Sequence, residues 1–223
     1  ARDPQDFWAQ QGVQVDWMRP FSIVRNASFL RPVRIRWYED GTLNASANCL
    51  DRHLGTRGDK TALIWEGDEP DERRTFTYSE LHAETCRMAN VLLSLGVEPG
   101  DRVALYLPNI PEAVMAMLAC ARVGAVHSVV FAGFSADALA ARIQDCGAKV
   151  LITANEGRRG GRTLPLKAQA DAALAGCSGV ESVIVVRRTR TGTPMQAGRD
   201  VWWEEARLTA APDCPPVEVN AEH

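Results

Sequence analysis

The sequence predicts an α/β fold with a mostly parallel sheet and helices on both faces. Short apolar runs recur at Arg102–Tyr106, Val126–Phe131 and Lys149–Thr153. Segments of helical length, Pro111–Val123 and Ser135–Cys146, separate these runs. Runs without polar alternation are typical of strands buried on both faces. Helical connections of this length suit the right-handed crossovers that join parallel strands.

The composition is that of a globular chain. Of 223 residues, 46% are apolar and 24% are charged, and the net charge is −3. This balance gives no reason to expect nucleic acid or an anionic membrane as a partner. No run of 18 apolar residues and no signal-peptide pattern is present. The six cysteines are scattered singly, as reduced thiols are, so a cytoplasmic location is expected.

Residues 1–40 are predicted to form an irregular, aromatic-rich docking arm, broken by Pro20 and Pro32. We expect its rings to cover a neighbouring surface rather than to build a core of their own. The rings belong to Phe7, Trp8, Trp17, Phe21, Phe29, Trp37 and Tyr38.

The segment between this arm and the apolar runs predicts two helices and a hairpin. Apolar spacing indicates a helix over Asn44–Leu54, and β-rich runs at Thr61–Trp65 and Arg73–Thr77 indicate a hairpin. Thr77 and Glu80 form a capping-box pattern at the head of a long helix. Its expected buried stripe is Leu81, Thr85, Met88, Leu92 and Leu95, with Gly96 placed to end it.

The later elements follow from the same patterns. In the helix over 111–123, the residues expected on one face are Val114, Met117, Leu118 and Ala121. Beyond it we expect a helix over Leu166–Ala175, a buried strand over Ser182–Val186 and an exposed loop over Thr189–Arg199. A short element begins at Trp202, and no regular element is predicted over residues 212–223.

Three loops are expected to meet at the carboxyl edge of the sheet, where α/β proteins bind ligands. They are Leu107–Ile110, Ala132–Phe134 and Ala154–Pro165. Gly133 allows close approach to the backbone, and Ser135 is placed to cap the following helix, whose N-terminus favours an anion. A glycine before a capped helix is also common without any ligand.

The sharper signal is Asn155–Arg162, which holds three arginines and three glycines. Guanidinium groups pair with phosphate bidentately, so this loop at the strand ends predicts a phosphate site. A solvated basic loop is the alternative.

Other site patterns are absent from the sequence. It has no P-loop motif and no GxGxxG in a strand–turn–helix setting. Its histidines (His53, His82, His127, His223) lack metal-binding spacing, and His127 is expected as a hydrogen-bonded core residue. The triplet 51–53 looks like a helix surface. No catalytic residue and no metal ligand is therefore assigned.

Several blocks together resemble the N-terminal part of AMP-forming acetyl-CoA synthetases, from about Phe7 to Glu222. These blocks are Trp37–Asn44, Ala47–Leu54, Ala62–Gly67, Ala116–Val130, Gly133–Ser135, Glu156–Arg162 and Gly198–Trp203.

The resemblance implies a ligase that uses acetate, ATP with magnesium, and coenzyme A. Acetate and ATP give acetyl-adenylate and pyrophosphate, and coenzyme A then yields acetyl-CoA and AMP. It also implies the residues that contact coenzyme A, with the arginines at its 3′-phosphate end: Gly133, Arg159, Gly160, Gly161 and Arg162.

The resemblance further implies that residues 41–223 are an incomplete portion of the large N-terminal domain of an adenylate-forming enzyme. The family's phosphate loop, carboxylate pocket and mobile C-terminal domain would lie beyond His223, so no ATP or magnesium residue is assigned here. The expected partners are small-molecule substrates and the remainder of the same polypeptide. Alone, the chain is expected to be inactive and to self-associate through exposed apolar surface or strand edges.

Two other functions remain open. The chain could belong to a propionyl-CoA or other short-chain acyl-CoA synthetase, because its sequence contains no acyl pocket. It could also be a non-catalytic module that binds coenzyme A or phosphate.

Overall fold

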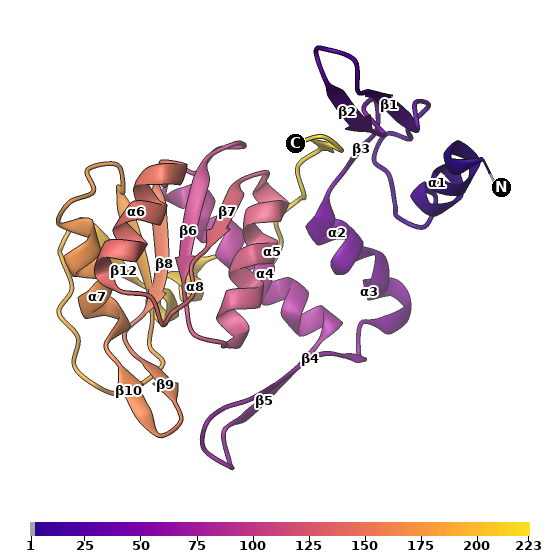
Figure 1. Ribbon diagram of the computed structural model, residues 1–223. Helices are drawn as coiled ribbons and strands as arrows, with labels where there is room; N and C mark the ends of the chain where they lie inside the picture. The colour runs from indigo at the N-terminus through magenta and orange to yellow at the C-terminus, as the bar shows by residue number, and fades with distance from the viewer. Residues whose placement is uncertain (1–2) are drawn as a thin grey trace.

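A five-stranded parallel sheet lies at the centre of the computed structural model, which describes residues 3–223 (Figure 1). Its strand order is β12-β11-β8-β6-β7, and every neighbouring pair is parallel. The predicted α/β class is thus confirmed. The strands are β6 (Arg102–Tyr106), β7 (Val126–Val129), β8 (Val150–Ala154), β11 (Ser182–Val186) and β12 (Asp200–Trp202).

Helices cover both faces of this sheet. The two on one face pack against each other, and the other three cover the opposite face. The chain runs from β6 outward to β7 and then returns past β6 to β8. The strand order therefore reverses between β6 and β8, the position at which such sheets bind ligands. The pair on one face is α6 (Ala136–Cys146) and α7 (Leu166–Leu174). The three on the opposite face are α4 (Tyr78–Ser94), α5 (Pro111–Val123) and α8 (Trp203–Thr209).

Both predicted ends of the long helix α4 are confirmed. The Thr77 hydroxyl accepts from the Glu80 amide at 3.2 Å, and the Glu80 carboxylate accepts from the Thr77 amide at 2.8 Å. At the other end Gly96 has φ 77°, and its amide and that of Val97 donate to the last turn of the helix. The expected stripe is buried, apart from the half-buried Leu95.

The face predicted for α5 is wrong. Its fully buried apolar side chains include Met115, Ala116, Ala119, Cys120 and Val123, whereas the predicted set is only half-buried. The helix is apolar on nearly every side, so its periodicity does not tell which side meets the sheet and which meets α4.

The hairpin of β4 (Thr61–Glu66) and β5 (Arg73–Thr77) is confirmed, whereas several other elements differ from the prediction. The helix expected over Asn44–Leu54 is instead broken at Leu50 into α2 (Ala45–Cys49) and α3 (Asp51–Arg57). The third edge loop contains a hairpin of β9 (Gly157–Arg159) and β10 (Arg162–Leu164). The pairing of β3 (Thr42–Leu43) with β13 (Val219–Asn220) and the strand β12 were not predicted.

The N-terminal arm is less irregular than the sequence suggests. It holds α1 (Pro4–Gly12) and a hairpin of β1 (Arg25–Ser28) and β2 (Arg34–Trp37), set apart from the sheet (Figure 1). Its rings also pack on one another, with Phe21 and Tyr38 centroids 4.6 Å apart and Trp17 and Phe21 centroids 5.0 Å apart. The rings thus contact one another, but none of these aromatic side chains is fully buried, as expected for an arm without a core of its own.

A buried charge cluster ties three helices together. The Arg122 side chain is 1% exposed, and both of its terminal nitrogens donate to Asp51 at 2.8 Å. His82 Nε2 lies 3.4 Å from the same carboxylate. The prediction of residues 51–53 as simple helix surface is wrong for Asp51, because its partners come from distant α4 and α5. His127 is also misassigned, since it is exposed on the edge strand β7.

The cluster predicts that stability falls at alkaline pH. The hydrogen bond to Asp51, followed by the one to Cys86, raises the pKa of His82 from 6.5 to about 9. The protonated form is thus favoured by folding, and its contribution is complete below pH 6.5 and lost as the pH rises through about 9. We expect a decrease of at most about 3 kcal/mol in the free energy of unfolding, measured with urea across this range. His82→Gln should flatten the profile, and an equally steep profile in that variant would contradict the assignment.

No helix in the described part, residues 3–223, is long and apolar enough to cross a membrane.

Candidate anion-binding site at the sheet edge

A cavity of about 330 Å³ opens at the carboxyl ends of the central strands. All three loops predicted at this edge contribute to its wall, at the point where the strand order reverses. The β4–β5 hairpin supplies the facing wall. The lining residues between positions 107 and 164 are Leu107, Pro108, Asn109, Ile110, Phe131, Ala132, Gly133, Arg158, Arg159 and Leu164.

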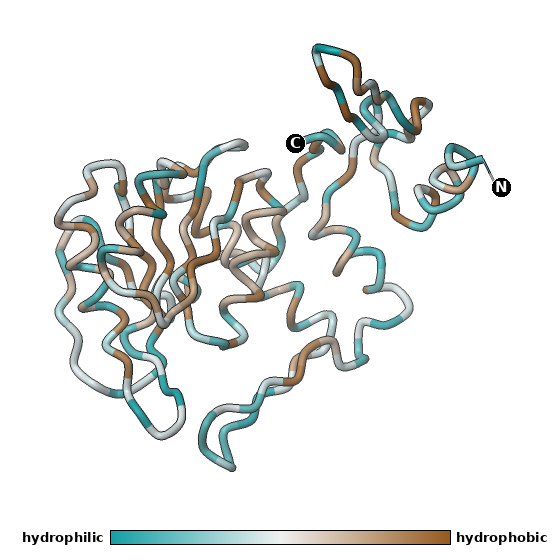
Figure 2. The backbone as a smooth tube through the Cα atoms, viewed as in Figure 1, coloured by the Kyte–Doolittle hydropathy of each residue, from teal (hydrophilic) through white to brown (hydrophobic). Residues whose placement is uncertain are grey.

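The arginine-rich segment, predicted as a loop at the strand ends, forms a tight hairpin. Its two-residue turn is Gly160-Gly161, with φ of 56° and 73°. Hairpin turns of this length favour positive φ at both positions, which glycine adopts without strain. A Cβ at either position would meet no atom within 4 Å, so the requirement is conformational rather than spatial. The hairpin is strongly hydrophilic beside the apolar strands (Figure 2).

The strand register places Arg159 and Arg162 directly opposite each other. Opposed residues of an antiparallel pair share one face, and like charges there repel. Both side chains are exposed, and neither pairs with a carboxylate of the described residues. An anion between them would remove this repulsion. The arginine on the other face, Arg158, instead pairs with Glu69 at 3.5 Å.

Gly133 brings bare backbone to the rim of the cavity. A Cβ there would lie 2.4 Å from the Phe131 ring, so no larger residue fits without moving that ring. The Arg159 guanidinium lies over the same ring, 5.4 Å from its centroid. Just beyond, Ser135 caps α6 by accepting from the Ala138 amide at 3.3 Å.

The facing wall is fixed by hydrogen bonds and charge. Trp65 Nε1 donates to the Asn109 carbonyl at 2.6 Å, and the Arg188 guanidinium lies 5.1 Å from the Trp65 ring centroid. Arg188 also donates to Glu72 at 2.8 Å, which lowers the pKa of that carboxyl. At the hairpin tips, the Gly161 amide donates to Asp68.

Asn155 organises the base of this edge, and the sequence interpretation missed its role. Its side chain is 2% exposed, and Oδ1 accepts from the amides of Glu156 and Arg188, both at 2.9 Å. Its Nδ2 donates to Thr189 Oγ1 at 3.0 Å. One amide thus joins the loops after β8 and β11. An asparagine directly after a buried strand is the signal that could have identified it.

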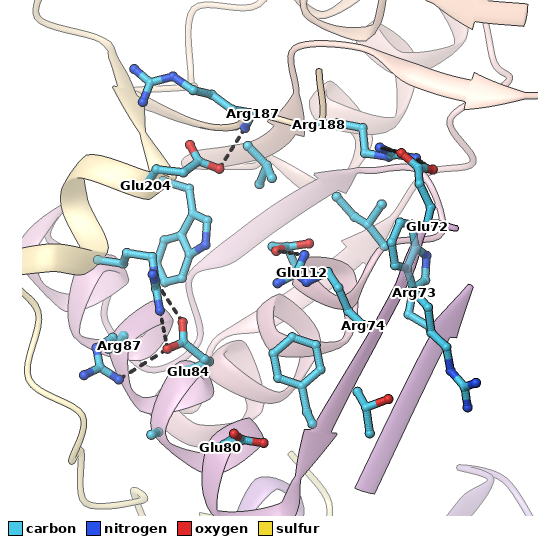
Figure 3. A pocket seen from close by; sticks show the side chains of 18 of the residues that line it. Glu72, Arg73, Arg74, Glu80, Glu84, Arg87, Glu112, Arg187, Arg188 and Glu204 are labelled. Atoms are coloured by element: carbon cyan, nitrogen blue, oxygen red, sulfur yellow. Dashed lines mark hydrogen bonds and ion pairs between the residues drawn. The ribbon is translucent and has the colours of Figure 1, made fainter. Parts of the chain in front are cut away.

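A larger hollow of about 770 Å³ lies on the other side of the β4–β5 hairpin (Figure 3). Its arginines all pair with carboxylates: Arg74 with Glu112 at 2.6 Å, for example, and Arg207 with Glu84 at 2.9 Å. Charge is therefore already balanced in this hollow. The smaller cavity at the strand ends is the better anion site, because only there do opposed arginines lack carboxylate partners among residues 3–223.

The structure brings together only part of the predicted site. Gly133 and Arg159 line one cavity, whereas Gly160, Gly161 and Arg162 continue from it to the hairpin tip. Within residues 3–223, no group of three His, Cys, Asp or Glu side chains is placed to hold a metal ion.

Comparison with known proteins agrees with this architecture. Residues 50–222 match the model of the AMP-binding enzyme family, and residues 1–49 match that of the acetyl-coenzyme A synthetase N-terminus. The acetyl-coenzyme A synthetase of Methylobacterium radiotolerans is 59% identical over 99% of this chain and 35% of its own length. That of Methylocella silvestris is 56% identical over 99% of this chain and 34% of its own.

Among solved structures, acetoacetyl-CoA synthetase from Streptomyces lividans is similar with a TM-score of 0.86 and 30% identity. The match covers 97% of this chain and 32% of that one. The chain thus spans about a third of the length of the relatives it matches.

Proposed function

The chain belongs to the AMP-binding enzyme family, and from this we propose that it forms the N-terminal third of an AMP-forming acetate–CoA ligase. Such an enzyme converts acetate, ATP and coenzyme A to acetyl-CoA, AMP and pyrophosphate. The observation that carries the proposal is the pair of opposed arginines beside a glycine-lined cavity at the switch point.

In this proposal the chain supplies part of the coenzyme A site. Arg159 and Arg162 bind the 3′-phosphate through charge-assisted hydrogen bonds, which are stronger than neutral ones. Gly133 lets the ligand lie against the backbone beside Phe131, and Gly160 and Gly161 hold the two arginines in register. The support is geometric: these residues meet at one edge, and the opposed positive charges favour an anion.

We assign no ATP or magnesium group to this chain. The sequence has no phosphate-loop motif to which such a group could be assigned. In the proposal those groups, together with the carboxylate pocket, come from the two thirds of the relatives' length that the chain does not match. The remainder of the polypeptide is thus its main partner. Six free cysteines support a reducing, cytoplasmic setting.

Two structural proposals accompany this function. The division into an arm of residues 1–40 and an α/β portion of residues 41–223 is supported by the position of α1, β1 and β2 outside the central sheet. Self-association is supported by the edge strand β7, where Val126 and Val129 are exposed and one side lacks a neighbouring strand.

The function can be tested with a chimera, in which this chain replaces the matching third of the Methylobacterium radiotolerans enzyme. We expect acetate-dependent ATP–pyrophosphate exchange and acetyl-CoA formation by the chimera and neither by the chain alone, because catalysis depends on positioned groups that the chain lacks. The control is the relative without its own N-terminal third. Exchange by the chain alone would contradict the assignment of the ATP groups.

The chimera also separates the alternatives. A folded chimera that forms no acyl-CoA would favour a non-catalytic module that binds coenzyme A or phosphate. A propionyl-CoA or other short-chain acyl-CoA synthetase remains a second candidate for the native protein, because the acyl pocket of the chimera comes from the relative. Acyl preference must therefore be measured on the native full-length product.

A further inference from the structure

Tyr106, the last residue of β6, is fully buried at the point where the strand order reverses. Its hydroxyl is directed at three acceptors: the carbonyl of Phe134 at 2.8 Å, the carbonyl of Ala132 at 3.4 Å, and Gln169 Oε1. The two carbonyls flank Gly133. One buried phenol thus holds the glycine loop from below and connects it to α7.

The backbone of the same residue reaches the second loop of the proposed site. The Tyr106 carbonyl accepts from Thr153 Oγ1 at 2.9 Å. Thr153 is fully buried in β8, the strand that leads through Asn155 into the arginine hairpin. Tyr106 is therefore bonded both to the loop that carries Gly133 and to β8, the strand that leads into the hairpin of Arg159 and Arg162.

The hydrogen bonds of the Tyr106 hydroxyl are not needed to form the sheet. The pairing of β6 with β7 and β8 uses backbone groups, and the aromatic ring fills the core with or without its hydroxyl. The hydroxyl carries one proton, which these acceptors share, and its oxygen lies within hydrogen-bond distance of both carbonyls around Gly133. Burial raises the pKa of Tyr106, so the phenol keeps its proton and remains a donor near neutral pH.

We propose that the Tyr106 hydroxyl is a positioning group for coenzyme A, which sets the distance between the Gly133 backbone and the Arg159–Arg162 hairpin. The inference rests on the proposed function and extends it to a residue that does not touch the ligand. Its role is specific to the thiol-transfer half of the reaction. The adenylation half-reaction precedes coenzyme A binding and does not depend on this spacing.

The test is Tyr106→Phe in the chimera, which removes one oxygen and keeps the ring. We expect the KM for coenzyme A to rise by about 3- to 30-fold, since one buried hydrogen-bond donor is lost. Acetate-dependent ATP–pyrophosphate exchange should stay within about twofold of the parent, because that step needs no coenzyme A. Gln169→Leu, which keeps the phenol and removes one partner, should shift the KM in the same direction by less.

The matched control is Tyr78→Phe, because Tyr78 begins α4 away from the cavity. It should change neither half-reaction. If the parent chimera is active and Tyr106→Phe has the same KM for coenzyme A, the inference is wrong. The proposed function would still stand. A parallel loss of both half-reactions, with a lowered thermal midpoint, would also overturn the inference by showing a purely structural role. A parent chimera that forms no acetyl-CoA would overturn the proposed function, and this inference with it.

Discussion

Replacing Arg159 or Arg162 with Ala in the chimera should weaken coenzyme A binding about 10- to 100-fold. Each guanidinium is expected to contribute ~1.5–3 kcal/mol through charge-assisted hydrogen bonds to the 3′-phosphate. The constants for acetate and ATP in pyrophosphate exchange should barely change, because coenzyme A enters after that step. Steady-state kinetics of both half-reactions measure the two effects separately.

Two controls sharpen this experiment. Dephospho-coenzyme A lacks the 3′-phosphate, so the parent and both variants should use it nearly alike. Arg158→Ala removes the same charge from the neighbouring position, which also lines the cavity but whose guanidinium already pairs with Glu69. That variant should have little effect on coenzyme A. Unchanged coenzyme A constants for Arg159→Ala and Arg162→Ala would identify the hairpin as ordinary basic surface.

Asp200→Ala is expected to cause the largest loss of stability. The Asp200 side chain is 0% exposed and receives Lys167 Nζ at 2.8 Å and Arg199 Nε at 2.6 Å. Burial by itself would raise the pKa of this carboxyl, but hydrogen bonds from Arg199 and Lys167 hold it below its usual value. Without Asp200, the buried Lys167 and Arg199 must share the partly exposed Asp171, and loss of a buried partner of this kind costs about 3–5 kcal/mol.

The measurement is denaturant unfolding of the chain at neutral pH. Lys167, which is 2% exposed, would keep only Asp171 as an anionic partner. Glu205→Ala is the matched control, because Glu205 pairs with Arg187 on the surface and is 64% exposed. It should change stability by less than about 1 kcal/mol. If Asp200→Ala also lowered the free energy of unfolding by less than about 1 kcal/mol, the ion pairs of Asp200 with Lys167 and Arg199 would not stabilise the fold.

The sequence allowed prediction of those elements whose signals are local. The capping box at Thr77, the glycine after α4 and the apolar strands β6, β8 and β11 each depend on neighbouring residues. The parallel order followed from the helical connections between the strands. Short elements such as β12 and β13 were missed because two or three residues carry no period.

Contacts between distant segments could not be predicted. Asp51 looked like helix surface because its partner Arg122 lies 71 residues away. The pair Gly160-Gly161 suits the two-residue turn that sets the register of β9 and β10, but strands of three residues with three arginines carry no apolar alternation that predicts a hairpin. The predicted site residues were placed by resemblance, whereas the role of Tyr106 emerges only from the folded arrangement of the loops.

The pairing of β3 with β13 has a consequence for synthesis on the ribosome. Thr42 and Leu43 pair with Val219 and Asn220, and the amide of Trp37 donates to Glu222. The N-terminal arm therefore acquires its docking strand only after nearly 180 further residues have been added. At typical translation rates of 5–20 residues per second, the arm waits roughly 10 to 35 s. During that interval the arm and β3 lack their contacts with β13 and Glu222, so early folding of the arm depends on the contacts among its own residues.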